Sequence, residues 1–223
     1  MERPPSRVPS WPTSVLLLLA LAGPTAFIVL KDLLFGKSPT LRVEIVSQLL
    51  YCGMAAVVLW GVIHWEHLPL TSIGIRRPGR TTLITAAILI AAALVLLPVV
   101  TAPLATSLST EEVSASLRRL ATVPLCFRVF VGICAGAVEE TLYRGYAIER
   151  LATITGRRWM GAALATLAFA CAHIPVWGIG FSLTADLAAG TLLALSYLWK
   201  RDLIANIVAH GTALVVAMVT VVP

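Results

Sequence analysis

The stretch Leu125–Leu151, LCFRVFVGICAGAVEETLYRGYAIERL, determines how the rest of the chain has to fold. It is long and apolar enough to cross a hydrocarbon core of about 30 Å as a helix. Its middle nevertheless contains the charged residues Glu139, Glu140 and Arg144. A charge at the centre of a bilayer costs about 2.5–3.5 kcal/mol on insertion scales. These three charges therefore have to be paired, to face a wet cavity, or to take part in chemistry.

The composition shows the same apolar character along the whole chain. Of its 223 residues, 58% are hydrophobic and only 13% are charged, which is unusual for a soluble protein. The sequence predicts an all-α fold, a polytopic transmembrane helical bundle. Seven spans are expected, or eight if one long run is really two: Trp11–Leu30, Val43–Trp65, Thr82–Ala105, Leu125–Leu151, Trp159–Trp177, Gly180–Trp199 and Leu203–Val222.

Lys and Arg residues outside the spans predict the orientation, because cytoplasmic loops are enriched in them. A cytoplasmic N-terminus places more of them inside (Arg3, Arg7, Arg76, Arg77, Arg80, Arg150, Arg157, Arg158, Lys200, Arg201) than outside (Lys31, Lys37, Arg42, Arg118, Arg119). We therefore expect an integral protein of a bacterial inner (plasma) membrane with its N-terminus in the cytoplasm. The net charge of +6 then reflects topology and contact with anionic lipid, and no nucleic-acid partner is expected.

Two regions are expected along the chain. Residues 1–123 form an N-terminal region with three spans and an amphipathic loop, and residues 124–223 form a core with four spans. A cleaved signal peptide is the alternative to the first span, although the apolar run continues past a plausible cleavage region. The loop contains Ser109 and Glu112 at capping-box spacing, which predicts either an amphipathic helix on the membrane surface or a short solvated connector helix. The four cysteines lie in apolar runs and are expected to be buried thiols.

The spacing of the central charges suggests different roles for the two glutamates. Glu140 and Arg144 are four residues apart and share one helix face, so they can pair. Glu139 is rotated by about 100° from Glu140. If Glu139 faces a polar cavity, it can act as a base. The structural alternative is that both glutamates neutralise Arg144 and Arg128 in a buried network.

Polar residues in two later spans can join this group. His173 lies near the end of the fifth span, and Asn206 and His210 share one face of the seventh. Three helices that bring polar groups to one place are how helical bundles build catalytic or metal sites. His64 and His67 flank Trp65 at a span end and are expected to be interfacial. Asp186 is expected to be a structural residue at a helix start, and the alternative is that it is a partner of the site.

These residues form a recognisable pattern. The motifs Glu139-Glu140-x-x-x-Arg144 and Phe169-x-x-x-His173, followed by His210 in a late span, resemble the CPBP family of intramembrane proteases, also called the CAAX prenyl endopeptidase or Abi family. The resemblance covers residues 124–223, and the loop at 70–78 also resembles a segment that often precedes that core.

The resemblance implies a role for each motif residue. Glu139 would activate the attacking water, with Glu140 supporting it. Arg144 would anchor the carboxylates, and Phe169 would pack beside the site. His173 and His210 would polarise the scissile carbonyl or its oxyanion, or ligate a metal.

One position departs from the family pattern. The last motif usually has Asn or Asp four residues after its histidine, and here that position is Leu214. Loss of an oxyanion donor typically costs about 2.7–4 kcal/mol in the barrier. Asn206, one turn before His210, is the candidate replacement. If it points elsewhere, the chain is a weakened or inactive member.

The motif residues are compatible with either a zinc site or a mechanism without a metal ion. Glu139, His173 and His210 could form a zinc site of the hydrolytic kind, but no His-Glu-x-x-His helix is present. We favour a glutamate protease without a cofactor, in which the histidines donate hydrogen bonds to the oxyanion.

The expected function is therefore intramembrane hydrolysis of a peptide bond near the C-terminus or membrane boundary of a substrate. The expected partners are the lipid bilayer and a membrane-embedded or lipid-anchored protein or peptide. The alternatives are a catalytically inactive membrane immunity or binding protein and a small proton-coupled transporter. No paired broken helices in related halves support the transporter.

Overall fold

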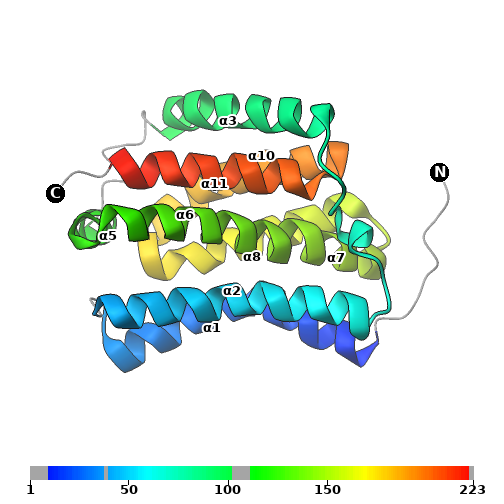
Figure 1. Ribbon diagram of the computed structural model, residues 1–223, viewed down its shortest axis with the longest axis horizontal. Coiled ribbons are helices and arrows are strands. Elements are labelled where there is room, and N and C mark those ends of the chain that lie inside the picture. The colour runs from blue at the N-terminus through cyan, green and yellow to red at the C-terminus, as the bar shows by residue number, and fades with distance from the viewer. Residues whose placement is uncertain (1–9, 38–39, 102–110, 221–223) are drawn as a thin grey trace.

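The structure is a computed structural model that describes residues 10–37, 40–101 and 111–220. Within these ranges it contains helices and no strands, so the predicted all-α fold is confirmed (Figure 1). The helices are α1 (Trp11–Phe35), α2 (Leu41–His64), η1 (Leu70–Ile73), α3 (Arg80–Thr101), α5 (Glu111–Thr122), α6 (Leu125–Glu139), η3 (Glu140–Ala147), α7 (Ile148–Thr155), α8 (Arg158–Trp177), α9 (Ile179–Phe181), η4 (Ser182–Asp186), α10 (Leu187–Lys200) and α11 (Leu203–Thr220).

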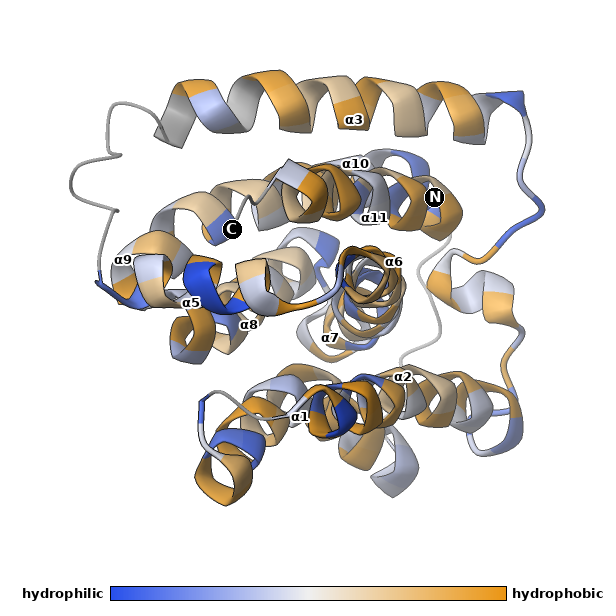
Figure 2. Cartoon of the chain, turned by 60° about the vertical axis from the view of Figure 1, so that its left-hand side comes forward, coloured by the Kyte–Doolittle hydropathy of each residue, from blue (hydrophilic) through white to orange (hydrophobic). Residues whose placement is uncertain are grey.

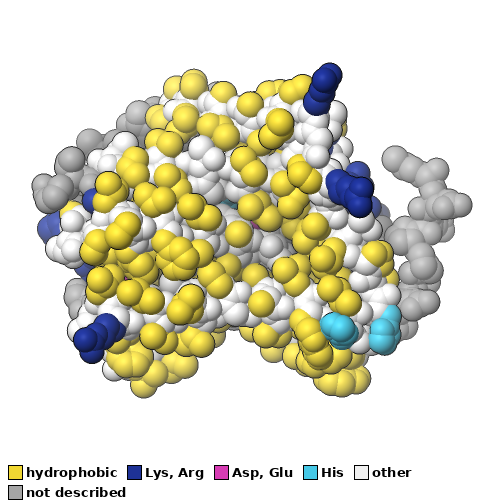
Figure 3. All heavy atoms as spheres, in the orientation of Figure 1, with side chains coloured by type: hydrophobic (Ala, Val, Ile, Leu, Met, Phe, Trp, Pro, Cys, Tyr) yellow, Lys and Arg dark blue, Asp and Glu magenta, His cyan; other side chains and the backbone are white. Residues whose placement is uncertain are grey.

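The outer surface of this bundle is suited to lipid. Figure 3 shows a face covered by hydrophobic side chains, with Lys and Arg at its margins. Large apolar residues such as Leu33 and Trp199 are more than two-thirds exposed, an arrangement that water would penalise and lipid would not. The protein is an integral membrane protein.

The predicted count of seven or eight spans is not confirmed. Five helical stretches have the length and hydropathy of spans: α1, α2, α8, Ile179–Lys200 and α11. In α3, the apolar part is the shorter stretch Arg80–Val95. The charged stretch from Leu125 is helical as far as Thr155, but it consists of three elements, and its longest, α6, has 15 residues, fewer than the roughly 20 that a span needs. The predicted span ends Ala105 and Val222 fall outside the described residues.

The bundle has α6 near its middle. The pair α1 and α2 lies on one side and α3 on the other, with α8, α10 and α11 between them (Figures 1 and 2). Contacts join α6 to α11 and to α2, and α1 to α8. The N-terminal helices thus pack directly on the helices that contain the motifs.

Small residues let α6 and α11 approach closely. A Cβ atom added at Gly136 would lie 2.6 Å from the Cα of Gly211, which no larger residue could tolerate. This contact lies one turn before Glu139 and beside His210. It therefore sets the distance between the two motif helices.

Two stretches of π-helix interrupt the regular helices near the middle of the bundle. The first, η3, begins at Glu140 and includes Arg144, and all eight of its residues are buried. The second, η4, ends at Asp186. Isolated π-turns are rare and occur often at functional sites, because they change the direction of side chains within a helix.

The helix at the loop between α3 and α6 is present as α5. The partner of its predicted capping box, Ser109, lies outside the described residues. Ser116 of α5 donates to the carbonyl of Val176 at the end of α8, with an oxygen–oxygen distance of 2.5 Å. The helix is thus attached to the bundle and is not a free connector.

The cysteines are all unpaired, and the prediction that they are buried is wrong, since none of the four is buried. Cys126 and Cys171 are exposed on the outside of the bundle, whereas Cys52 and Cys134 are half-buried. A thiol is apolar enough to face lipid, so an apolar sequence context does not by itself indicate burial in a membrane protein.

Candidate active site

Glu140 lies at the centre of a buried polar network. Its Oε1 accepts hydrogen bonds from Nη1 of Arg144 at 2.8 Å and from Nδ1 of His210 at 2.9 Å. Its Oε2 accepts one from Nδ2 of Asn206 at 3.0 Å. The predicted pairing of Glu140 with Arg144 is confirmed, and both side chains are almost fully buried. Glu140 is therefore held as an ionised carboxylate with both oxygens occupied, and it is not free to act as a base.

Arg144 is fixed from several sides. Its Nη2 donates to the carbonyl of Gly190 at 3.2 Å, and its guanidinium lies 4.2 Å from the ring centroid of Phe169. A Cβ at Gly190 would lie 3.0 Å from Phe169 and 3.2 Å from Arg144, so a glycine makes room for both. The Phe169 ring in turn lies 4.5 Å from the ring of His173. Phe169 thus separates the buried network from the histidine.

Glu139 has a different environment. Its Oε1 accepts a hydrogen bond from the Tyr51 hydroxyl at 3.4 Å. Its Oε2 is buried and has no hydrogen-bond partner among the described residues. That oxygen lies 3.9 Å from Nε2 of His173 and 3.8 Å from Nε2 of His210. These gaps are too long for direct hydrogen bonds, and they suit a small polar group that touches all three atoms.

The other ring nitrogen of each histidine is already engaged. Nδ1 of His173 lies 2.8 Å from the carbonyl oxygen of Phe169, and Nδ1 of His210 bonds to the carboxylate of Glu140. Because both partners are acceptors only, both Nδ1 atoms have to donate. Each Nε2 therefore presents a lone pair to Glu139 when the ring is neutral and a hydrogen when the ring is an imidazolium.

The comparison with protein families agrees with this geometry. Residues 121–216 match the model of the type II CAAX prenyl endopeptidase Rce1-like family. This segment belongs to the CPBP family of intramembrane proteases. No curated protein and no solved structure matches the chain.

The CPBP segment contains Glu139, Glu140, Arg144, Phe169, His173, Asn206 and His210, and the structure brings all seven together. They come from α6, η3, α8 and α11. Arg128, which the structural alternative placed in the same network, lies three turns before Glu139 and donates to the carbonyl of Met218 at 3.1 Å.

Asn206 supports the CPBP site through Glu140. The side chain is fully buried, and its Nδ2 donates both to Glu140 and to the carbonyl of Leu193, at 2.8 Å. An amide nitrogen has two hydrogens, so none remains for a substrate oxygen. The expectation that Asn206 replaces the missing oxyanion donor is not met by this geometry. Leu214 itself lies at the contact of α11 with Gly132.

Two residues of the site could not be found from the CPBP motifs. Tyr51 comes from α2, outside the matched segment, and only the fold brings it to Glu139. Tyr143 follows Glu139 by one turn, and its hydroxyl is buried without a hydrogen-bond partner within the described part of the chain. Tyr143 lies four residues after Glu139, a spacing that places both on one helix face, but it is not one of the motif residues.

Asp186 also lies near the site, within electrostatic range of His173, Glu139 and His210. It ends the π-turn η4, and its Oδ2 is buried with no hydrogen-bond partner in the described ranges. A residue that only begins a helix would instead have its carboxylate bonded to backbone amides.

The side chains around Glu139 are of the types that bind zinc, but they are not arranged as a zinc site. Glutamate and histidine are suitable ligands, but ligands about 2.0–2.1 Å from zinc lie only about 3.4 Å apart in a tetrahedron. Among the described residues, no group of three or more His, Cys, Asp or Glu side chains is arranged to hold a metal ion. The mechanism proposed below therefore uses the protein side chains alone.

Proposed function

We propose that the protein is an intramembrane endopeptidase of the glutamate type. It hydrolyses a peptide bond near the C-terminus or membrane boundary of a membrane-embedded or lipid-anchored protein or peptide. The family match supports CAAX-type proteolysis in general. The observation that supports the catalytic assignment is the unpartnered oxygen of Glu139, which faces Nε2 of both histidines.

Glu139 acts as the general base. A water molecule bound between its Oε2 and Nε2 of His173 can donate one hydrogen to each, at about 2.8 Å. The water oxygen attacks the carbonyl carbon of the substrate while Glu139 takes the proton. When the C–N bond breaks, the proton passes from Glu139 to the leaving amine. One water is consumed, and a carboxylic acid and an amine are released.

His210 stabilises the oxyanion. Donation from Nε2 requires the imidazolium form, and His210 has a carboxylate on each side, because Glu140 bonds to its Nδ1 and Glu139 lies beyond its Nε2. A preorganised charged donor of this kind stabilises the tetrahedral intermediate more than the ground state. His173, whose Nδ1 bonds to a backbone carbonyl, remains the neutral acceptor of the water.

The membrane arrangement is part of the proposal. The N-terminus lies in the cytoplasm of a bacterial cell, as the distribution of Lys and Arg predicts. The helical stretch Leu125–Thr155 crosses the bilayer together with α3 and the five long apolar helices, which gives seven spans. The charged centre of this stretch is tolerated because its partners come from within the bundle.

The test is a cleavage assay with the purified protein in proteoliposomes and a library of fluorogenic peptides attached to a lipid anchor. We expect the wild-type protein to cleave a subset and Glu139→Gln to cleave none. A wild-type protein that cleaves no member of the library, or a Glu139→Gln variant as active as wild type, would contradict the proposed function.

A further inference from the structure

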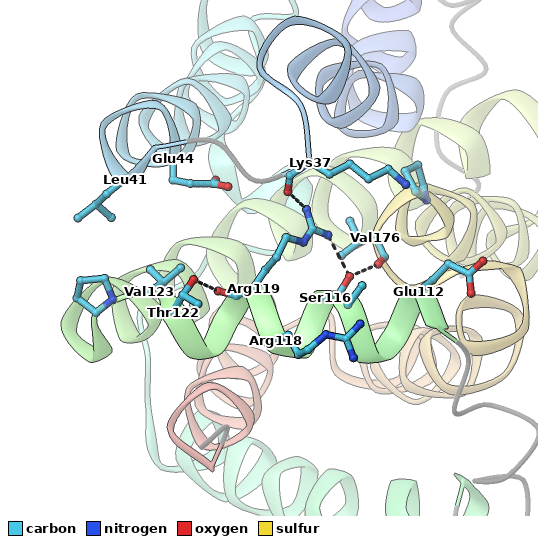
Figure 4. Close-up of a pocket in the computed structure, with 13 residues that line it drawn as sticks. Lys37, Leu41, Glu44, Glu112, Ser116, Arg118, Arg119, Thr122, Val123 and Val176 are labelled. Atoms are coloured by element: carbon cyan, nitrogen blue, oxygen red, sulfur yellow. Dashed lines mark hydrogen bonds between the residues drawn. The ribbon is translucent and has the colours of Figure 1, made fainter. Parts of the chain in front are cut away.

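Two adjoining cavities lie beneath α5, at the end of the bundle where α2 begins and α8 ends. Figure 4 shows the residues that line the outer one. The outer cavity has a volume of about 600 Å³ and the inner one about 230 Å³. They adjoin each other and are together called the joined cavities, because they share six lining residues: Glu44, Ser116, Arg119, Val123, Pro175 and Val176. The outer cavity alone has the size of ordinary ligand pockets.

Hydrogen bonds hold α5 in place over the two cavities. Ser116 bonds to the carbonyl of Val176, and Arg119 donates both to Oγ of Ser116 and to the carbonyl of Lys37 (Figure 4). Helix α5 is therefore hydrogen-bonded both to the end of α8 and to the loop that follows α1.

The inner cavity leads toward the candidate active site along two helices. On α2, Gln48 lines the cavity, and Tyr51, which bonds to Glu139, follows three residues later. On α8, Pro175 and Val176 line the cavity, and His173 precedes them. The Nε2 atom of Gln48 is buried and has no partner among the residues that the structure describes. A buried amide without a partner is costly. A rotation of the Gln48 side chain, which lines the inner cavity, would bring Nε2 to a hydrogen-bond acceptor there.

We propose that these joined cavities are the peptide-binding channel of the protease, and that Gln48 donates a hydrogen bond to the backbone of the substrate next to the scissile bond. This inference rests on the proposed function and adds the direction of access. The substrate reaches Glu139 from the α5 end of the bundle.

The lining selects a peptide as the occupant and argues against a lipid chain. Lys31, Asp32, Glu44, Arg119 and Arg128 line the inner cavity together with apolar residues. Lys31 is paired with Asp32 and Glu44, and these pairs still offer polar atoms to a peptide backbone, whereas a hydrocarbon chain would only desolvate them.

A second groove provides the internal comparison. It has a volume of about 220 Å³, lies between α3 and α10, and is lined mainly by apolar residues such as Ile88, Leu195 and Trp199. A hydrocarbon chain would prefer this groove. It shares Leu89 and Leu192 with a small cavity of about 40 Å³ that His210 lines. It is therefore the alternative route to the site.

The channel length sets which substrate residues occupy it. Glu44 lines both cavities, and Tyr51 lies seven residues further along α2, a distance of about 10 Å along the helix axis. An extended peptide covers about 3.3 Å per residue. About three residues of the substrate thus lie between the active site and the outer cavity.

The first experiment maps the bound peptide by photo-crosslinking in the full-length Glu139→Gln variant, which retains the peptide. Substrate peptides selected by cleavage with wild type contain a photoreactive residue three positions before or after the scissile bond. We expect one of the two probes to label α5 or the end of α8. Labelling of the groove between α3 and α10, or no labelling of the cavity walls by either probe, would overturn the proposal while cleavage by wild type still stands.

The second experiment blocks each route in the active protein. Val123→Trp fills the joined cavities, and we expect it to lower kcat/KM at least tenfold, mainly through KM. The matched control Leu195→Trp fills the α3–α10 groove and should leave kcat/KM within twofold of wild type. The reverse pattern would overturn the proposal, whereas no cleavage by wild type would instead contradict the proposed function.

A third variant tests the amide itself. Gln48→Leu keeps the side chain at similar size and removes the donor, which should lower kcat/KM about tenfold, as expected for one hydrogen bond. Thermal unfolding checks that the variant is folded, and it should melt no lower than wild type because it loses no internal hydrogen bond. Wild-type kcat/KM in folded Gln48→Leu would remove Gln48 from the channel.

Discussion

Replacing Glu139 with glutamine should abolish activity and leave stability almost unchanged, whereas replacing Glu140 with glutamine should mainly lower stability. Glu140 receives three hydrogen bonds at 2.8–3.0 Å and neutralises Arg144, and it is completely buried. Glu139 receives one hydrogen bond at 3.4 Å. The two side chains are neighbours in sequence and differ in almost every contact, so the same chemical change tests the division of labour between them.

The magnitudes follow from these contacts. Glu140→Gln leaves the guanidinium of Arg144 without its counter-ion in the bundle, which typically costs 3–5 kcal/mol. Because 1 kcal/mol shifts the melting temperature by about 2–4 °C for a chain of this size, a decrease of roughly 10 °C is expected. Glu139→Gln loses one long hydrogen bond, worth about 1 kcal/mol or less, and should melt within a few degrees of wild type.

The assay combines thermal unfolding in detergent with peptide cleavage at a temperature where all variants are folded. We expect Glu139→Gln to be stable and inactive, and Glu140→Gln to be unstable with residual activity. The control Glu111→Gln changes a carboxylate that is 82% exposed and should alter neither property. The reasoning is refuted if Glu139→Gln lowers the melting temperature as much as Glu140→Gln, or if Glu139→Gln retains activity.

Four further predictions concern the other groups at the site. Tyr51→Phe should keep the stacking on Phe27 but free Glu139 to rotate, lowering kcat several-fold with little change in KM, and an unchanged kcat would remove Tyr51 from the site. Asn206→Ala should lower the free energy of unfolding by about 1–3 kcal/mol, because it leaves Glu140 and the Leu193 carbonyl short of a donor. Adding Leu214→Asn to this variant should not restore activity, and a gain of activity would show that position 214 can still supply the family's donor. Activity measured after dialysis against a chelator should equal that of the untreated enzyme, and loss with restoration by zinc would show that Glu139, His173 and His210 bind a metal. His210→Ala should lower kcat by about 10²–10³-fold, as expected for loss of an oxyanion donor, and wild-type kcat in this variant would contradict its role as that donor.

The sequence predicts the membrane bundle and the chemical centre because both depend on local patterns. The spacing of Glu140 and Arg144 is that of one helix face, and the pair indeed forms. The histidines could be assigned to the same site because ionisable side chains within a membrane almost always face the interior of the bundle, where they pair with one another. These conclusions need only residue type and helical period.

Other features depend on tertiary contacts and could not be predicted in this way. The role of Asn206 is decided by the position of Glu140 and of the Leu193 carbonyl on two other helices. The π-turns at Glu140 and Asp186 have no pattern in the sequence that separates them from α-helix. The exposure of Cys126 and Cys171 follows from which face of a helix meets lipid, and apolar residues occupy both faces.

The site also depends on the part of the chain that the family match leaves out. Tyr51 of α2 bonds to Glu139, and Glu66, just after α2, accepts hydrogen bonds from Tyr146 at 2.8 Å and from Arg150 at 2.6 Å. The first contact orients the proposed base, and the second fixes the far end of the helical stretch that contains it. Because Glu139 makes the first contact itself and precedes the second in the same helical stretch, the position of α2 bears on where its free oxygen points. The N-terminal helices are therefore part of the proposed catalytic arrangement, and not only a membrane anchor for residues 121–216.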